Sequence, residues 1–506
     1  MHTADLLASA WEFAPLLLLG FIAVYLINNK FCQGLNHIPG PWLAGFSDIW
    51  RLVVVWGRRP EVVHRMLHAK YGPLVKIGPR TIIVSDPEAI RIIYALNAGY
   101  KKSNFYPVQM QVANGRELHS MFNTTDEAFH AKLRRAVSNA YAMSSLVKFE
   151  PLVDSTTNAF LKQLKQRFAD RKDESGICDL GTWLHYYAFD VIGELTFSSR
   201  IGFIDRGVDV SNIIGDLDWL LKYVAVVGQI PWLDRLLLKN PVRMWLSKFD
   251  FYNTTSSVAV FARQRISDRQ SRPVDHNSLG SKDFLSRFMD AKKKDQAFIS
   301  DERVLALTVA NVFAGSDTTA ITLRAIFYYL LRNPESMKKL LVEIGGSKDL
   351  ISWEESRNLP YLTAVIKEAL RIHPAAGLPL ERVVPSGGTS LCSTFIPSGT
   401  IIGCSAWVIH MNKSVFGEDA AFWRPERWTE GGSEKLALMN NMLFSFGAGS
   451  RTCIGKNISL LEMHKLVPAI LRSFQIELVN PQQSWELCNA WFVKQSNFLV
   501  RITSRD

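Results

Sequence analysis

One cysteine near the carboxyl end lies in a segment whose residue types favour metal binding. Cys453 follows the run Phe446-Gly447-Ala448-Gly449-Ser450-Arg451-Thr452 and precedes Ile454-Gly455. Glycines allow backbone amides to come close enough to hydrogen-bond a thiolate, which tunes how strongly the sulfur donates electrons. We therefore predict that Cys453 is a metal ligand. The other cysteines lie far apart without a C-x-x-C pair, which favours inert thiols in a reducing compartment: Cys32, Cys178, Cys392, Cys404 and Cys488.

Two further groups of polar residues fall on predicted helices. The run Ala314-Gly315-Ser316-Asp317-Thr318-Thr319 lies inside a helix that begins near Ser300. Glycine weakens a helix locally, and a threonine hydroxyl that bonds to the carbonyl one turn earlier can bend it and open a groove. Glu368 and Arg371 lie one turn apart on another predicted helix, where such a pair is usually a solvated ion pair.

Together these motifs resemble the cytochrome P-450 family. The segment that ends at Gly455 matches every specified position of the family's heme-binding loop, F-x-x-G-x-R-x-C-x-G. The run Pro425-Glu426-Arg427-Trp428 lies between the Glu368 helix and that loop, in the family's order. The resemblance covers nearly the whole chain, and it implies that Cys453 is the axial thiolate ligand of heme b (iron protoporphyrin IX).

The resemblance also implies a structural role for residues that would otherwise suggest acid–base chemistry. In the family, the arginine at the position of Arg427 joins the glutamate and arginine at the positions of Glu368 and Arg371 in a buried triad that supports the heme pocket. The family more often has phenylalanine where Trp428 stands, a difference that we expect the fold to tolerate.

Residues with direct roles at the cofactor follow from the same resemblance. Asp317 and Thr318 are expected to relay protons to the oxygen, with Asp317 mainly a gate and organiser and Thr318 nearer the oxygen. Heme propionates are anionic and need cationic or hydrogen-bonding partners. The family's partners correspond to His130, a position where the family often has tryptophan, and to Arg134, Arg382 and Arg451.

The implied activity is that of a monooxygenase. Thiolate ligation favours cleavage of the O–O bond, so that one oxygen atom enters the substrate and the other leaves as water. Electrons would come singly from NADPH through an NADPH–cytochrome P-450 reductase. Two alternatives stay open: a heme-thiolate isomerase or dehydratase that needs no reductase, and a non-catalytic heme-binding protein. The intact Asp317-Thr318 pair favours the monooxygenase over both.

The substrate is expected to be an apolar small molecule. The helix from Pro360, the run Arg382 to Gly388 and Trp428 resemble the filamentous-fungal, pisatin demethylase-like branch, which suggests a terpenoid, alkaloid or polyketide intermediate of secondary metabolism. Small residues at 375–377 would leave space for a bulky substrate, or would serve a turn after Pro374. The stretches expected to contact the substrate are 105–122, 311–313, 375–380 and 491–492.

The elements that must position these residues are mostly helices. The pattern predicts strands at 74–77 and 81–84 with a turn at 78–80 and a helix that begins at Asp86-Pro87-Glu88. Helical periodicity is found at 125–147, 183–195, 258–269, 300–331, 334–344 and 360–373. We therefore expect a mainly α fold with small β-sheets, and by resemblance a heme between the long central helix and the helix that follows Cys453.

The amino terminus predicts a membrane anchor. Residues 13–27 are uncharged and mostly apolar, acidic residues precede them, and basic residues from Lys30 onward follow, which keeps the body in the cytosol by the positive-inside rule. We predict a single-pass anchor and linker at 1–37 in the endoplasmic reticulum membrane and a catalytic domain at 38–506. Pro39 and Pro41 predict a stiff turn between them. The formal charge of +11 favours an acidic reductase as partner, and the dispersed basic residues do not indicate nucleic-acid binding.

Overall fold

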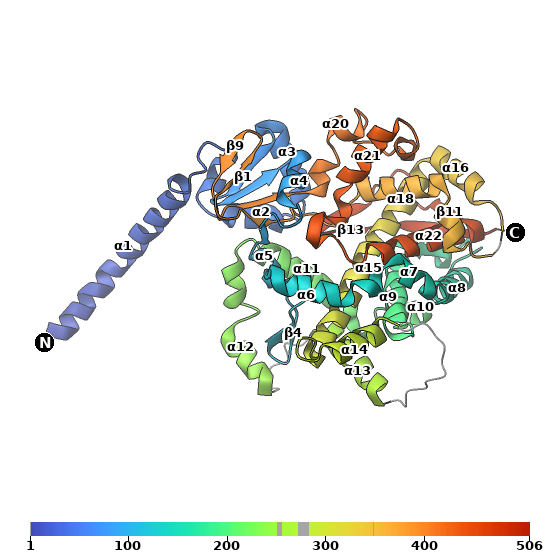
Figure 1. Cartoon of the computed structure of the whole chain (residues 1–506), viewed down its shortest axis with the longest axis horizontal. Coiled ribbons are helices and arrows are strands. Elements are labelled where there is room, and N and C mark those ends of the chain that lie inside the picture. The colour runs from blue at the N-terminus through green and yellow to red at the C-terminus, as the bar shows by residue number, and fades with distance from the viewer. Residues whose placement is uncertain (1, 250–255, 272–282, 348, 506) are drawn as a thin grey trace.

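A single long helix stands away from a mainly helical body with small sheets, which is the predicted fold class. The computed structural model of the protein describes residues 2–249, 256–271, 283–347 and 349–505. Figure 1 shows α1 (His2–Phe31) leading from the amino terminus to the edge of the body near β1 and α2.

The helices predicted at 183–195, 258–269, 300–331, 334–344 and 360–373 are present, with ends that differ from the prediction by at most three residues. In α15 (Asp301–Arg332), the Ser300 side chain accepts a hydrogen bond from the Arg303 amide, acidic residues occupy the first turn, and the helix ends just before Pro334. The other longer helices of the body are α2 (Ile49–Trp56), α3 (Pro60–Tyr71), α6 (Glu127–Val137), α8 (Glu150–Arg167), α9 (Leu180–Phe197), α11 (Ile213–Val227), α13 (Ser257–Ser271), α14 (Phe284–Lys294), α16 (Pro334–Ile344), α18 (Pro360–Ile372), α21 (Ser433–Met442) and α22 (Lys456–Ser473).

The sheets bring distant parts of the chain together. The largest has the order β1-β2-β10-β7-β3, with β2 and β10 parallel and the other neighbours antiparallel. Its strands are β1 (Leu74–Gly78), β2 (Thr81–Val84), β10 (Ile401–Cys404), β7 (Arg382–Val383) and β3 (Lys101–Lys102). A second sheet has the order β11-β14-β6, formed by β11 (Phe474–Leu478), β14 (Leu499–Ser504) and β6 (Ile177–Asp179). β12 (Glu486–Ala490) and β13 (Phe492–Ser496) form a separate antiparallel pair.

Predicted local structure around the first sheet is confirmed, whereas one predicted helix is interrupted. β1, β2 and α4 (Glu88–Ile93) occupy the predicted positions. The stretch 125–147 is not one helix, because α6 ends at Val137 and Ala142 is extended, with φ −67° and ψ 141°. The Asn457 side chain of α22 donates to the Tyr141 carbonyl at 3.0 Å. Tertiary contact with α22 therefore outweighs the helical periodicity here.

In the part of the chain that the structure describes, two helices are apolar and long enough to cross a membrane, and the two differ in how much of each is buried. The apolar part of α15 is 72% buried, so α15 is the central helix of the body, packed along α9 and against α22. The segment Phe13–Phe31 is only 6% buried. An apolar helix that stands clear of the body favours a bilayer as its surroundings.

The linker after α1 is bound to the first sheet. Leu35 and Ile38 are buried, and the Lys76 amide of β1 donates to the Pro39 carbonyl at 2.8 Å. A Cβ on Gly40 would lie 2.1 Å from the Lys76 carbonyl oxygen, so this approach requires glycine. The predicted stiff turn is therefore held by contacts with the body as well as by its prolines.

Candidate active site

The cysteine loop owes its shape to a close backbone contact. It runs from η9 (Phe444–Phe446) through η10 (Gly449–Arg451) to α22, and the Cys453 amide donates to the Phe446 carbonyl at 2.9 Å. Gly449 has φ +66°, and a Cβ there would lie 1.7 Å from the Tyr94 carbonyl oxygen. Only glycine fits this position.

The Cys453 sulfur has backbone donors beside it, and the residue is exposed. Desolvation by the surrounding protein raises the pKa of the thiol, whereas hydrogen bonds from the Gly455 and Lys456 amides and the charge of Arg134 lower it. Amide donors beside such a sulfur are what an axial thiolate requires, because they stabilise its negative charge.

α15 presents exposed residues in the interior of the body. Ala314 is exposed and Thr318, one turn later, is partly exposed, although most of the helix is buried. The Thr318 hydroxyl donates to the Ala314 carbonyl at 2.9 Å, which is the expected back-bond. Thr319 lies 2.6 Å from Ser459 of α22, measured between the hydroxyl oxygens. The exposed face of α15 is thereby held near the helix that follows Cys453, and a flat cofactor between the two would cover both.

Packing gives Gly315 a role that the sequence did not indicate. α15 continues through this residue without interruption. A Cβ on Gly315 would lie 2.9 Å from Ile192 Cδ1 of α9, closer than real side chains approach. The glycine therefore allows α9 and α15 to pack closely.

The four residues predicted to bind propionates lie within electrostatic reach of one another. Burial first, and then the charges of Arg451, Arg134, Lys102 and Arg382, lower the pKa of His130 to about 3. A buried group of cations is unfavourable unless anions neutralise it. Two heme propionates would supply such anions, so the cations of this group (Arg134, Arg382, Arg451 and Lys102, which we call the cation cluster) fit the predicted cofactor, with neutral His130 beside them as a hydrogen-bonding partner.

Some of these side chains already have protein partners. Arg451 pairs with Glu127 of α6 at 2.7 Å and donates to the Met121 carbonyl, and Arg134 donates to the Thr452 carbonyl at 2.8 Å. These contacts hold both guanidinium groups beside the cysteine loop.

Lys102 belongs to the cation cluster but was not predicted. It lies opposite Arg382 in the first sheet and is buried, with its ammonium 4.1 Å from the Tyr106 ring centroid and 4.3 Å from that of Phe122. Burial and then the charges of Arg382 and Arg451 hold its pKa well below the ordinary value. No local motif marks this lysine, because the pairing of β3 with β7 creates its position.

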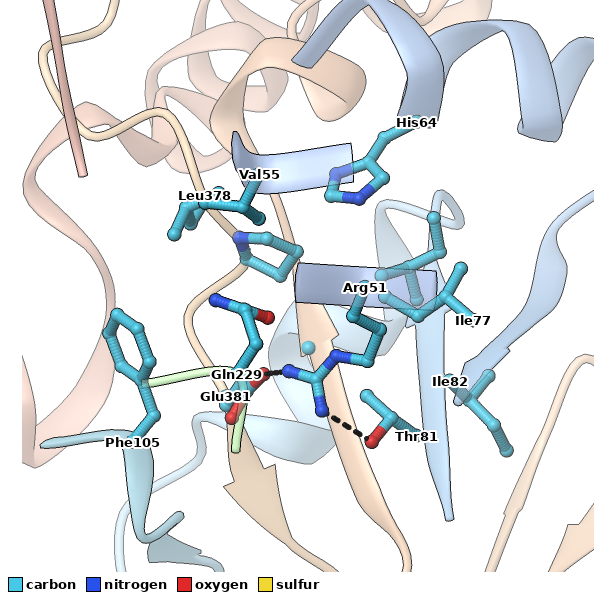
Figure 2. A pocket seen from close by; sticks show the side chains of 13 residues that line it. Arg51, Val55, His64, Ile77, Thr81, Ile82, Phe105, Gln229, Leu378 and Glu381 are labelled. Atoms are coloured by element: carbon cyan, nitrogen blue, oxygen red, sulfur yellow. Dashed lines mark hydrogen bonds and ion pairs between the residues drawn. The ribbon is translucent and has the colours of Figure 1, made fainter. Parts of the chain in front are cut away.

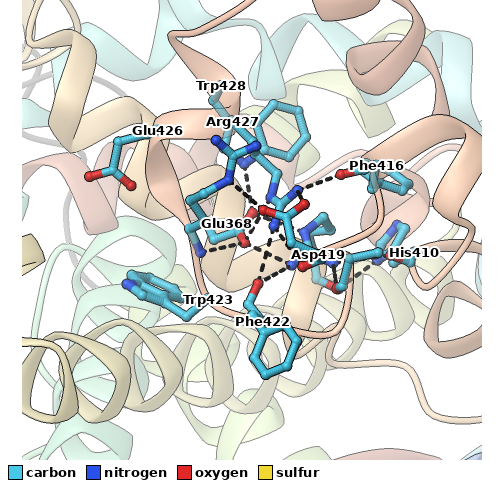
Figure 3. Close-up of polar contacts among 12 residues, drawn as sticks. Glu368, His410, Phe416, Asp419, Phe422, Trp423, Glu426, Arg427 and Trp428 are labelled. Carbon is cyan, nitrogen blue, oxygen red and sulfur yellow. Dashed lines mark hydrogen bonds and ion pairs between the residues drawn. The ribbon is translucent and has the colours of Figure 1, made fainter.

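The Glu368 triad is buried, as predicted (Figure 3). Arg371 binds both carboxylate oxygens of Glu368 at 2.7 and 2.9 Å, and Arg427 binds one at 3.0 Å. All three side chains are fully buried. Their remaining donors bond the Asp419 carboxylate and backbone carbonyls, including those of His410 and Asp419. Full hydrogen bonding is what makes a buried ion network tolerable.

Trp428 forms a hydrogen bond to the triad as well as filling space beside it. Its indole nitrogen donates to Glu368 at 2.9 Å, and the residue is buried. Phenylalanine, common at this position in the family, has no such donor. The fold accommodates the tryptophan, and its indole adds a hydrogen bond that the sequence did not predict.

His410 links the triad to the cysteine loop. Its Nδ1 lies 2.8 Å from the Arg371 carbonyl oxygen, and its Nε2 accepts a hydrogen bond from the Phe444 amide at 2.8 Å. This pattern requires the neutral ring with its proton on Nδ1. Burial lowers the pKa of His410 to about 3, which favours that state.

Asp317 does not face Thr318 in this structure. It is 1% exposed and contacts His185 of α9 and Lys494 of β13, neither of which was predicted. Both partners come from distant parts of the chain, so only the folded structure identifies them. This placement agrees with a gate or organiser more than with direct proton donation.

Four stretches predicted to contact the substrate meet in one apolar cluster, which we call the Trp491 cluster. Phe105 and Phe122 lie 5.1 and 6.0 Å from the Trp491 ring, between centroids. α11 joins them, although the sequence did not indicate it. Other members are Tyr106, Val108, Leu221, Val224, Ala225, Val226, Val227, Ile321, Leu378, Ala490 and Phe492, with Phe313 and Ala375 packed against them.

Two predicted substrate residues have structural roles instead. Asn311 donates to Thr196 of α9 at 2.8 Å and accepts from the Tyr141 hydroxyl at 3.1 Å. A Cβ on Gly377 would lie 2.3 Å from Asn489 Nδ2. Gly377 therefore serves close packing against β12, and it leaves no space for a substrate.

A separate small cavity lies between α2, the first sheet and α5 (Phe105–Val108), as Figure 2 shows. The Arg51–Glu381 ion pair crosses it. Arg51 also donates to the Thr81 hydroxyl at 2.9 Å, and the Ser103 hydroxyl donates to Glu381 at 2.5 Å. Its volume of about 10 Å³ holds about one water molecule. None of its lining residues comes from α15 or the cysteine loop, although Val55, Phe105 and Leu378 border both this cavity and the Trp491 cluster.

Comparison with known proteins was consistent with this geometry. The family profile described as Cytochrome P-450 matches residues 43–499. A cytochrome P-450 monooxygenase of Aspergillus terreus is 44% identical over 452 residues, covering 87% of this chain and 90% of the relative. The cytochrome P-450 monooxygenase cicH of Emericella nidulans is 41% identical, covering 96% and 98%. The monooxygenase mpaDE of Penicillium brevicompactum is 40% identical, covering 94% of this chain and 56% of that longer protein.

Proposed function

The chain belongs to the family of fungal cytochrome P-450 monooxygenases, and from this premise we propose that it oxidises an apolar intermediate of fungal secondary metabolism. The observation that carries the proposal is the exposed Cys453, whose sulfur lies beside the Gly455 and Lys456 amides at the start of α22, the helix that contacts α15. The aromatic and aliphatic side chains of the Trp491 cluster support an apolar substrate. The resemblance to the pisatin demethylase-like branch supports a terpenoid, alkaloid or polyketide.

The residues of the candidate active site fit heme b. Bound there, heme supplies the activation of dioxygen with electrons delivered singly. Cys453 would be its axial ligand, with the Gly455 and Lys456 amides stabilising the thiolate. The cation cluster would bind the propionates.

Thr318 and Asp317 have different tasks in this proposal. The Thr318 hydroxyl lies on the exposed face of α15 and donates to the Ala314 carbonyl, and a water or an oxygen bound there would compete for this hydrogen bond. Asp317 lies behind this surface, so it would act when released from its present partners.

We also propose the partner and the location that the sequence indicates. An NADPH–cytochrome P-450 reductase would supply the electrons, and the net charge of +11 favours docking of an acidic protein. α1 would anchor residues 1–37 in the endoplasmic reticulum membrane as a single pass, with the domain at 38–506 in the cytosol.

The decisive test is the difference spectrum of the reduced, carbon-monoxide-bound protein for wild type and Cys453→Ser. A Soret band far to the red in wild type that is lost in the variant supports thiolate ligation, and a histidine-like spectrum contradicts it. NADPH-dependent oxygen consumption with reductase then separates a monooxygenase from an isomerase or dehydratase and from a non-catalytic heme protein, neither of which consumes oxygen.

A further inference from the structure

Lys494 links Asp317 of α15 to Asp218 of α11, a helix of the Trp491 cluster. Its ammonium forms an ion pair with Asp317 at 2.8 Å and is also bonded to Asp218. Asp317 belongs to α15, Asp218 to α11 and Lys494 to β13. Asp317 is 1% exposed and Asp218 is 38% exposed. One cation therefore bridges a fully buried carboxylate and a carboxylate at the surface.

The second oxygen of Asp317 is bound by His185 of α9. Burial alone would raise the pKa of Asp317, but Lys494 and His185 hold it well below the ordinary value. Arg324, two turns further along α15, is also within electrostatic reach of Asp317. The carboxylate is thus kept charged and turned toward α9 and β13, away from Thr318.

α11 also forms part of the Trp491 cluster. Leu221, Val224 and Ala225 of this helix pack there with Phe105. A substrate that enters or leaves the cluster must therefore displace α11 or pack against it, and displacement of α11 carries Asp218 with it. Because Asp218 and Asp317 share a single ammonium, a change at one carboxylate alters how strongly the other is held.

We propose that Lys494 is a positioning residue that couples the placement of α11 to the freedom of Asp317. When α11 packs against the body as in this structure, which we call closed, Asp218 shares the Lys494 ammonium. The ammonium then binds Asp317 less strongly. When α11 is lifted, Lys494 binds Asp317 alone and keeps it away from Thr318. Proton delivery would then be favoured only when the substrate cluster is closed. This inference rests on the proposed function, since Asp317 matters to the reaction only if it serves a monooxygenase.

Hydrogen exchange of the full-length, heme-loaded protein tests the coupling through the amides of α11. In Lys494→Met, α11 loses the ion pair between Asp218 and Lys494, and we expect hydrogen exchange of its amides to become about threefold faster. In Asp317→Asn, the Lys494 ammonium pairs with Asp218 alone and binds it more strongly, so we expect hydrogen exchange of the α11 amides to become slower. Opposite signs are the key result, because a merely structural role would loosen α11 in both variants.

Two further variants complete the experiment. Lys494→Arg keeps the cation and should restore exchange close to that of wild type. Lys222→Met removes an exposed lysine from α11 itself and should leave its exchange unchanged. Unchanged or faster exchange of α11 in Asp317→Asn would overturn the proposal. The reduced carbon-monoxide spectrum of the same samples shows separately whether heme-thiolate ligation, and hence the proposed function, holds.

Discussion

Trp428→Phe tests whether the indole of Trp428 stabilises the buried triad beyond filling space. The change removes the 2.9 Å hydrogen bond to Glu368. Arg371 and Arg427 still bind this carboxylate, so the substitution leaves no unpaired buried charge. The loss is then that of one hydrogen bond to a charged group, which with the smaller ring volume reduces the free energy of unfolding by about 2–3 kcal/mol.

Urea unfolding of the heme-loaded protein, followed by the carbon-monoxide-bound Soret band, measures this loss. Trp423→Phe is the matched control, because the Trp423 indole donates to the neutral Ser336 hydroxyl at 3.2 Å. There we expect about 1 kcal/mol. Equal destabilisation of the two variants would refute the reasoning, and would mean that Trp428 acts only through its shape.

Two other predictions follow from the cation cluster and the buried histidines. Lys102→Met should release heme to excess apomyoglobin about tenfold faster, through loss of a charged partner of a propionate, whereas the adjacent, exposed Lys101→Met should not. Stability should fall as the pH drops below about 6.5, because three of the buried histidines outside the cation cluster are neutral and the unfolded chain binds protons first, at up to about 4 kcal/mol per pH unit for the three together. Urea midpoints at pH 7.5 and 5.5 should therefore differ less in His373→Gln than in wild type. The three, with pKa values lowered by burial to about 3, 4 and 3, are His64, His373 and His410.

The sequence predicted those parts of the site that depend on motifs. The Thr318 back-bond depends on residues one helical turn apart, whereas the cysteine loop and the buried triad were predicted through the resemblance to a family. The left-handed backbone of Gly449 is local to the loop, but its close approach to Tyr94 is a contact between distant parts of the chain. The cationic residues were also predicted to be near one another, through the resemblance to a family.

What the sequence could not predict depends on contacts between distant elements. Lys102 reaches the cation cluster because β3 pairs with β7, and Lys494 reaches Asp317 because β13 packs beside α15. Asn311 was assigned to the substrate by its position on α15, but the direction of its side chain is decided by Thr196 on α9. Tertiary contacts also interrupt the helix predicted at 125–147.

The attachment of the linker to the first sheet has a consequence for producing the protein without its anchor. Removal of residues 1–32 would take away α1 with its exposed apolar surface and the hydrogen bond from Asn29 to the Phe46 carbonyl, and would retain Leu35, Ile38 and Gly40 in their contacts with the body. Removal of residues 1–42 would uncover the edge of β1 that Pro39 now protects, together with the apolar surface beneath Leu35 and Ile38. An uncovered strand edge promotes aggregation, so the shorter truncation should give the more soluble protein.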